Sequence, residues 1–142
     1  MADNHTPEAR RLNMSHIRSK DTKPEKQVRL YLFSKGFRYR KNDSRLPGKP
    51  DIYLPKYKTV VFINGCFWHK HEGCSSFVWP KSNTDYWKTK IAGNVSRDQR
   101  HYSELSHMGL RVIVVWECEL KKPVFEVTME KLVRSILSQD RW

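Results

Sequence analysis

Two apolar runs in the chain have the composition of buried β-strands. Residues 59–63 read Thr-Val-Val-Phe-Ile, and residues 110–116 read Leu-Arg-Val-Ile-Val-Val-Trp. Both runs are short and rich in β-branched side chains, which favours strands over helices. Their nearly continuous apolarity predicts a central position for residues 59–63 and burial for residues 110–116. Two weaker strands are expected at residues 37–41, where apolar and basic side chains alternate, and at residues 51–54.

Helices are predicted from apolar spacing and from the residues that start and stop them. The expected helices cover residues 6–20, 21–36, 84–108 and 124–137. Gly36 and Gly109 end the second and the third. Gly93-Asn94 could interrupt the third helix, with Asn94 capping a second piece. Residues 67–83 show no periodicity, which predicts a long loop that something must hold in place.

The charge of the chain indicates a polyanionic partner. Lys and Arg number 27 against 15 acidic residues, which gives a net charge of +12, and aromatic residues make up 12%. Phosphates pair with basic side chains and bases stack on aromatic rings, so nucleic acid is favoured. An anionic membrane is disfavoured because no segment resembles a lipid-embedding basic helix. We therefore expect no membrane partner, and the three cysteines, an odd number, favour an intracellular protein over a secreted disulfide framework.

The order of predicted elements is α-α-β-β-β-α-β-α, which indicates an α/β fold with a mixed sheet flanked by helices. A chain of 142 residues fits one domain, so residues 1–142 are expected to form a single domain. The first helix has only a thin apolar stripe of Leu12, Met14 and Ile17 among four basic residues. This pattern suits an arm at residues 1–20 that lies along DNA better than it suits a core helix.

The cysteines indicate a metal site. Cys66, His71 and Cys74 form a Cys-x4-His-x2-Cys cluster, and Cys118 follows the strand expected at residues 110–116. Three thiolates and one imidazole make a closed tetrahedral zinc site. His69 competes with His71 for the fourth position, and three buried free thiols are the alternative interpretation. We favour structural zinc with His71, because a long loop without a core needs a tether.

Pro50-Asp51 stands at the start of an expected strand, where a carboxylate could hold a divalent cation at the edge of the sheet. The same pattern opens the active-site motif of a large nuclease superfamily, which usually continues with an acid-x-Lys triplet on the next strand. Here the corresponding residues 61–64 read Val-Phe-Ile-Asn, without an acid or a lysine. Either another group replaces them, or the protein is a zinc-stabilised DNA-binding protein without catalysis.

His69 is the candidate replacement, because a histidine with a near-neutral pKa can take a proton from an attacking water. Asp98 could orient this imidazole or hold a metal-bound water. It lies four residues after Asn94, so the two share a helix face. The alternatives are a surface or zinc-binding histidine, and an acid placed by the helix dipole.

Three aromatic residues are candidates for contact with bases. Phe67 and Trp68 directly precede His69, and Trp87 lies close to Lys90 on an expected helix. Apolar wedges that enter a base stack kink DNA at a cost of a few kcal/mol per step, which added contacts offset. Packing in a small core is the alternative, but two large rings beside a histidine in a basic loop favour DNA.

In combination, these motifs resemble those of the very-short-patch-repair DNA mismatch endonucleases. The matching segments are Asn13-Met14 with Ile17 and Asp21-Thr22, Leu46-Pro47-Gly48-Lys49-Pro50-Asp51, Gly65-Cys66-Phe67-Trp68-His69, Gly93-Asn94-Val95 with Arg97-Asp98, and Val114-Val115-Trp116-Glu117-Cys118. They span residues 13–118. The two most specific segments are Gly-Cys-Phe-Trp-His and Asn-Val-x-Arg-Asp.

The resemblance implies a restriction-endonuclease-like fold and a strand-specific nick 5′ of the mispaired thymine in a T:G mismatch, the lesion left by deamination of 5-methylcytosine. It implies Mg²⁺ held by Asp51 and by the main-chain oxygen of Ile63. It implies His69 as general base, with Asp98 and Glu25 at the active site. Threonine is frequent in the family at the position of Ile63, and a main-chain ligand tolerates this difference.

The resemblance also implies the structural site and the DNA contacts. The implied zinc ligands are Cys66, His71, Cys74 and Cys118. The implied DNA contacts are Phe67, Trp68 and Trp87 from the major groove and Met14 and Ile17 from the minor groove, joined by Lys90 and Asn94. The family suggests mismatch-repair proteins and a cytosine methyltransferase as partners in a bacterial cytoplasm. A monomer is expected because no spare apolar helix face stands out, and a less selective endonuclease of the same fold is the alternative within enzymes.

Overall fold

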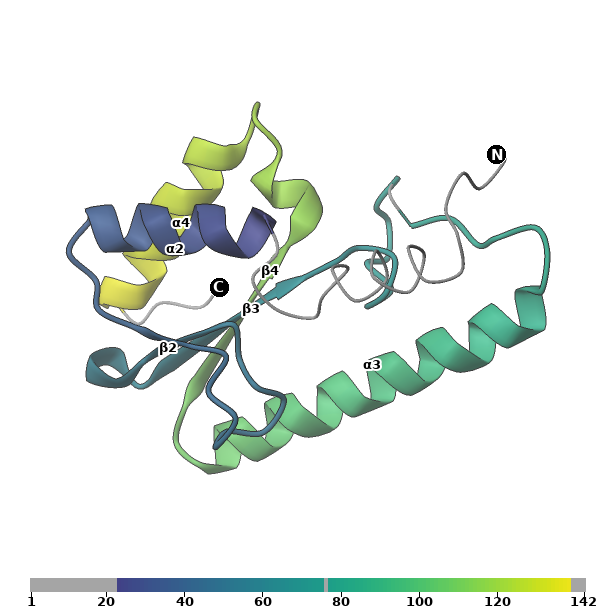
Figure 1. Cartoon of the computed structure of the whole chain (residues 1–142), viewed down its shortest axis with the longest axis horizontal. Helices are drawn as coiled ribbons and strands as arrows, with labels where there is room; N and C mark the ends of the chain where they lie inside the picture. Colours follow the sequence, from purple (N-terminus) through teal and green to yellow (C-terminus); the bar gives the residue numbers. More distant parts are fainter. Residues whose placement is uncertain (1–22, 76, 139–142) are drawn as a thin grey trace, which may run out of the picture.

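A four-stranded sheet forms the centre of the computed structural model, which describes residues 23–75 and 77–138 (Figure 1). Its order is β1 (Arg40–Lys41), β2 (Ile52–Leu54), β3 (Thr59–Asn64) and β4 (Arg111–Trp116). The first two pairings are antiparallel, and β3 pairs with β4 in parallel, from Thr59 opposite Arg111 to Asn64 opposite Trp116. A parallel pair needs a long crossover, which the loop and helix between β3 and β4 provide. The mixed α/β fold predicted from the sequence is confirmed.

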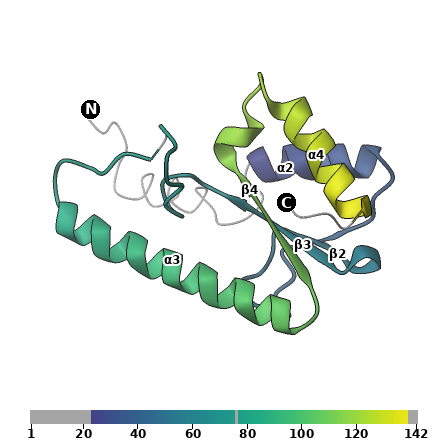
Figure 2. The same ribbon diagram turned by 180° about the vertical axis from the view of Figure 1, so that it is seen from behind.

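Helices cover both faces of the sheet (Figures 1 and 2). Helices α2 (Lys23–Ser34) and α4 (Phe125–Ser138) lie on one face, and α3 (Thr84–His107) crosses the other. The larger core, under α2 and α4, includes the fully buried Leu32, Ile52, Ile113 and Leu132. The smaller core, under α3, is built on Val60, Phe62 and Leu105. Two short 3₁₀ turns complete the fold, η1 (Pro55–Tyr57) and η2 (Glu117–Leu120).

The expected interruption of the long helix is wrong, because α3 runs unbroken from Thr84 to His107 through Gly93 and Asn94. A single interior glycine costs roughly 1 kcal/mol relative to alanine, which the contacts of a 24-residue helix can outweigh. Asn94 therefore caps no second piece.

Two strand predictions also differ from the structure. The strand expected at residues 37–41 is reduced to Arg40–Lys41, because the Phe37 N–H still donates to the Leu32 carbonyl at the end of α2. Of the strand expected at residues 110–116, residues 111–116 form β4, but only Ile113 and Val115 are fully buried there. The reason is that β4 is an edge strand of the described sheet. In contrast, β3 lies in the interior of the sheet, as predicted.

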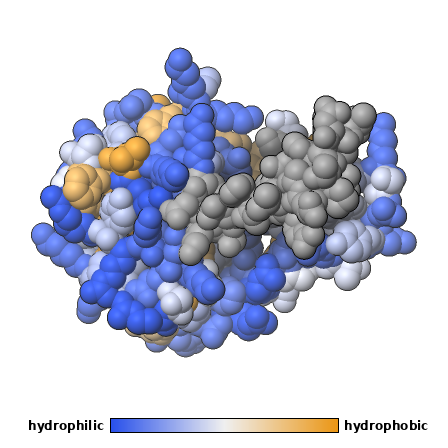
Figure 3. Space-filling model, in the orientation of Figure 1, coloured by the Kyte–Doolittle hydropathy of each residue, from blue (hydrophilic) through white to orange (hydrophobic). Residues whose placement is uncertain are grey.

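The face shown in Figure 3 is mostly hydrophilic, and its apolar residues gather over α2 and α4. Leu30 and Phe33 on α2 are 71% and 53% exposed, and Val127 on α4 is 68% exposed. The absence of a spare apolar helix face, on which the expectation of a monomer depended, therefore does not hold for these helices. The monomer itself stays a prediction. Among the described helices, none has the length and apolarity needed to cross a bilayer.

Candidate active site and metal centre

Asp51 directly precedes β2. Its electrostatic neighbours come from both helix layers, Glu25 and Arg29 from α2 and Tyr102 from α3. Its Oδ2 accepts a hydrogen bond from the Ile63 N–H at 2.7 Å. The carboxyl is therefore fixed between β2 and the end of β3, and it is only 7% exposed.

A second carboxyl, from Glu25 on α2, lies close to Asp51. Burial, together with the neighbouring Glu25, raises the pKa of Asp51 to about 8, although the Ile63 N–H and Arg29 act in the opposite direction. Glu25 is itself buried and lies 3.6 Å from the Arg29 guanidinium. Two buried carboxyls from separate elements form an oxygen-rich site, costly for two anions and suited to a hard cation such as Mg²⁺. The residues present therefore fit that ion.

His69 and Asp98 form a second polar group, which joins the loop after β3 to α3. His69 Nδ1 lies 2.5 Å from Asp98 Oδ2, and the side chains are 27% and 15% exposed. The structure thus brings together the histidine and the carboxylate that the sequence proposed as partners. Because Nδ1 faces Asp98, Nε2 is the ring nitrogen that can exchange a proton with a substrate or water.

Three polar residues of α3, four positions apart, contact the end of β3 and the loop that follows it. Asn94 Nδ2 donates to the Trp68 carbonyl at 3.1 Å, and Asp98 binds His69. One turn further on, the Tyr102 hydroxyl accepts a hydrogen bond from Asn64 Nδ2 at 2.8 Å. Residues at i and i+4 share a helix face, so one face of α3 carries all three contacts.

Tyr102 and Asn64 are the site residues that sequence reasoning missed. The available signal was the spacing of Tyr102, four residues after Asp98. Burial raises the pKa of Tyr102 to about 12, the negative carboxyls of Asp98 and Asp51 raise it too, and the Asn64 N–H opposes them. Tyr102 therefore lies within the electrostatic reach of both carboxyls.

The loop that leads into Asp51 also packs on α3. Gly48 has a positive φ of +75°, and a Cβ added there would lie 3.0 Å from the His101 side chain. A glycine is required on both counts. Within the same loop, the Asp43 carboxylate accepts hydrogen bonds from the Arg45 main chain and guanidinium, at 2.8–3.0 Å.

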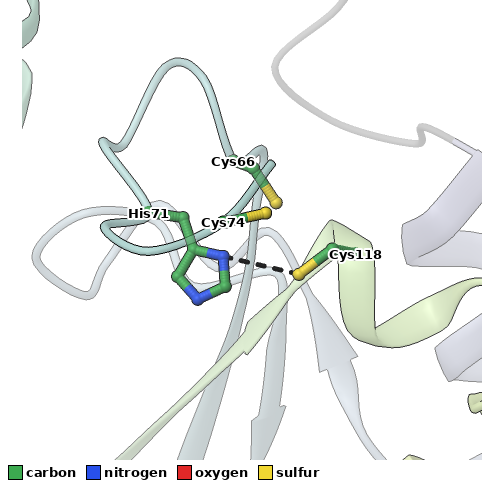
Figure 4. Close-up of side chains that lie close together, drawn as sticks. All are labelled: Cys66, His71, Cys74 and Cys118. Atoms are coloured by element: carbon green, nitrogen blue, oxygen red, sulfur yellow. Dashed lines mark hydrogen bonds between the residues drawn. The ribbon is translucent and has the colours of Figure 1, made fainter. Parts of the chain in front are cut away.

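Four potential metal ligands cluster beside this site. The ligand atoms of Cys66, His71, Cys74 and Cys118 all lie within 4.8 Å of one another (Figure 4). His71 Nδ1 is 3.4 Å from Cys118 Sγ. In a tetrahedral zinc site with ordinary bond lengths that separation is about 3.6 Å, so the spacing fits. The cluster can bind a metal such as zinc.

The environment of the cluster favours a bound cation. Burial raises the pKa of Cys118 to about 12, and the neighbouring thiols of Cys74 and Cys66 add to the shift. A divalent ion would reverse this cost because it stabilises thiolates. The His71 ring stacks on Trp116, with centroids 4.2 Å apart and planes 7° from parallel, which fixes the imidazole orientation. His69 contacts Asp98 instead, so of the two competing histidines the structure places His71 in the cluster.

The aromatic residues expected to contact DNA pack together. The ring centroids of Phe67, Trp68 and Trp87 lie 5.2–5.8 Å apart, and Trp68 is 46% exposed. The sequence did not single out three further rings in this group, Phe77, Trp79 and Tyr86. Lys90 is exposed on α3. Met14 and Ile17, with the helix expected at 6–20, lie outside the described residues, and all DNA contacts stay predictions.

Comparisons with known proteins agree with this geometry. A family model described as DNA mismatch endonuclease Vsr matches residues 2–75, more than half of the chain. The type II nicking enzyme V.NmeAIP of Neisseria meningitidis is 55% identical over 137 residues, which cover 96% of this chain and 97% of that protein. The type II nicking enzyme V.XorIIP of Xanthomonas oryzae is 51% identical over 84% of this chain and 88% of its own length.

The DNA mismatch endonuclease Vsr of Escherichia coli is 43% identical over 121 residues, which cover 85% of this chain and 77% of that enzyme. The region of similarity extends well beyond the motifs, because each alignment includes at least 84% of the chain. The chain therefore belongs to the Vsr family of DNA mismatch endonucleases.

Proposed function

We propose that the protein is a DNA endonuclease that nicks one strand 5′ of the mispaired thymine in a T:G mismatch, in a reaction that depends on Mg²⁺. One observation carries the proposal: Asp98, which contacts His69, and Asp51 both lie within the electrostatic reach of Tyr102 on α3. The family membership and the names of the relatives, mismatch endonuclease and nicking enzyme, support a reaction on DNA.

The proposed ion site consists of Asp51 and the main-chain oxygen of Ile63, with Glu25 close by. A Mg²⁺ ion bound there supplies electrostatic neutralisation of the scissile phosphate and of the leaving oxygen. Asp51 is already oriented for this role by the Ile63 N–H. The missing acid-x-Lys triplet is then replaced by Glu25 from α2 and by His69 from the loop.

His69 is proposed as the general base. Its Nε2 takes a proton from the attacking water, while Nδ1–H donates to Asp98 Oδ2. The Asp98 carboxylate holds the ring in this tautomer and stabilises the imidazolium that forms. The partial burial of both side chains strengthens this pairing relative to water.

Recognition of the mismatch is assigned to the aromatic group. Of the three rings expected to contact DNA, Trp68 is the exposed one, and Phe67 and Trp87 pack against it. A ring that stacks on a base contributes about 1–3 kcal/mol. A mismatched step unstacks more easily than a paired one, so insertion favours T:G over T:A. Basic residues, in a chain of net charge +12, bind phosphates without reading sequence.

Zinc is proposed as the structural ion on Cys66, His71, Cys74 and Cys118. The first three ligands belong to the loop after β3, and Cys118 belongs to η2 after β4. The ion therefore ties the loop to the end of the neighbouring strand. His69 and Trp68 lie inside this tethered segment. The zinc therefore positions both the proposed general base, His69, and the ring proposed to stack at the mismatch, Trp68.

The direct test uses end-labelled duplexes that differ only in one T:G or T:A pair, incubated with the protein in Mg²⁺ or in EDTA. A nick 5′ of the mispaired T, on one strand and only with Mg²⁺, is expected. Equal cutting of both duplexes would support a less selective endonuclease of the same fold. Tight binding of the T:G duplex with no cut in any divalent ion would refute the enzyme and leave a DNA-binding protein.

A further inference from the structure

Tyr102 is a half-buried residue beside the site that the proposed reaction does not use. It lies on the face of α3 that also carries Asn94 and Asp98, and it contacts β3 in two ways. Its hydroxyl accepts a hydrogen bond from Asn64 Nδ2 at 2.8 Å. Its ring packs edge-on against Phe62, with centroids 5.1 Å apart and an interplanar angle of 63°. Tyr102 therefore contacts the end of β3 at two residues, Phe62 and Asn64.

Asn64 is the last residue of β3 and is only 4% exposed. The peptide unit that joins Ile63 to Asn64 is planar and contains the Ile63 carbonyl oxygen. A movement of the Asn64 main chain is therefore transmitted directly to that oxygen. The amide of the same Ile63 donates to Asp51, so this short segment is fixed on both sides.

We propose that Tyr102 is a positioning residue that holds, through Asn64, the main-chain oxygen of Ile63 in place as a ligand for the divalent ion. This inference rests on the proposed function. It assigns different tasks to two neighbouring turns of α3. Asp98 orients the general base, and Tyr102 sets the geometry of the ion site.

The roles of Asp98 and Tyr102 can be tested separately, because the two residues make different contacts. Removing the Tyr102 hydroxyl leaves the His69–Asp98 contact intact, since that contact uses other atoms. It leaves the buried Asn64 amide without this acceptor, and the cost of an unsatisfied buried donor favours a shift of Asn64, main chain included, toward another partner. The expected defect is thus weaker ion binding with little change in the chemistry once the ion is bound.

The test compares the wild type, Tyr102→Phe and Asn64→Ala. The matched control is Tyr57→Phe, which removes a half-buried phenol hydroxyl from the core on the opposite face of the sheet. Two quantities are measured: the Mg²⁺ dependence of nicking of a T:G duplex, and Mn²⁺ binding to the complex with nicked product, by electron paramagnetic resonance. The second measurement involves no turnover.

We expect Tyr102→Phe to raise both the half-saturating Mg²⁺ concentration and the Mn²⁺ dissociation constant about fivefold to tenfold, as the loss of one buried hydrogen bond allows. The rate at saturating Mg²⁺ and the affinity for T:G duplex in EDTA should stay near the wild-type values. Asn64→Ala should give the same shift, and the double variant no more, because both substitutions remove one interaction. Tyr57→Phe should match the wild type.

Wild-type ion curves in Tyr102→Phe, or an equal loss of rate at every Mg²⁺ concentration, would overturn the inference. If Tyr102→Phe does not fold, the test is made with Asn64→Ala alone. Mg²⁺ and Mn²⁺ curves in that variant that match the wild type would also overturn the inference. A wild-type protein that leaves the T:G duplex intact would overturn the proposed function and this inference with it. A nicking wild type whose variants share its ion curves would overturn the inference alone.

Discussion

Asp98 Oδ2 lies 2.5 Å from His69 Nδ1, although the two residues are 29 positions apart in the chain. Asp98 is in the middle of α3, so neither a helix dipole at a terminus nor a cap accounts for its place. The contact orients an imidazole that comes from a loop without regular structure. A long, straight helix thus supplies the geometry that the loop cannot provide by itself.

The first prediction concerns this pair. Asp98→Asn should lower the nicking rate by about 10²-fold to 10⁴-fold, because the amide no longer fixes the tautomer or stabilises the imidazolium. The dissociation constant for the T:G duplex should hardly change. Single-turnover nicking and a binding titration in EDTA measure the two effects.

A matched control is Glu104→Gln, an exposed acid on the same helix. It removes the same charge from α3, so it reports any general effect of charge on DNA affinity. Wild-type nicking by Asp98→Asn would contradict the role given to the contact.

The second prediction distinguishes the two histidines of the loop. His71→Ala should purify with little zinc and melt about 10 °C or more below the wild type, because binding of a structural ion contributes to the free energy of folding. His69→Ala should keep its zinc and its melting temperature but lose nicking. Elemental analysis, thermal melting and the nicking assay give the comparison, and zinc loss in His69→Ala alone would reverse the assignment.

The apolar runs of the sequence predicted β3 and β4 because burial of a strand is a local property of composition. The spacing of three residues, Cys66, His71 and Cys74, likewise indicated a metal-binding cluster. The fourth member, Cys118, could be assigned to it because Cys118 follows the end of an expected strand. The bond between Asn64 and Tyr102 was not predictable in this way, because it joins residues 38 positions apart on elements whose register depends on the whole fold.

The continuity of α3 was hidden for a different reason. Gly93-Asn94 carries a local preference for a break, and the tertiary contacts of α3, among them those of Asn94 and Asp98 with the loop, outweigh it. The same contacts place Trp68 and His69. The helix-breaking preference of Gly93-Asn94 thus conflicts with the unbroken α3 at the proposed active site. Such conflicts are expected at functional sites, where the geometry of the site overrides local preference.

The third prediction concerns Trp68. Trp68→Ala should weaken binding of the T:G duplex by roughly tenfold to a hundredfold, the loss expected for one stacked ring, and affect the T:A duplex less. Phe33→Ala is the control, because Phe33 is similarly exposed, at 53%, but lies on α2 across the sheet. Fluorescence anisotropy with both duplexes measures the difference. Equal weakening for T:G and T:A would show that Trp68 does not sense the mismatch.

The last prediction concerns pH and the loop before Asp51. Hydrogen bonds from Arg45 lower the pKa of Asp43 to about 2, below the value near 3.9 of an unfolded chain. A carboxyl whose pKa is lowered by folding stabilises the folded state above the unfolded pKa and loses this contribution as the pH falls through the folded one. Asp43→Asn should therefore lower the melting temperature at pH 7. The difference from wild type should shrink between pH 4 and pH 2.

The asparagine side chain of this variant keeps an oxygen that can accept the Arg45 main-chain N–H, so the substitution isolates the charged interaction with the guanidinium. Because the Arg45 side chain is 69% exposed, added salt should also reduce the difference at pH 7. Glu130→Gln, an exposed acid on α4, is the control and should melt like the wild type throughout. A difference between Asp43→Asn and wild type that persists unchanged at pH 2 would mean that packing, and not the ion pair, accounts for the contribution of Asp43.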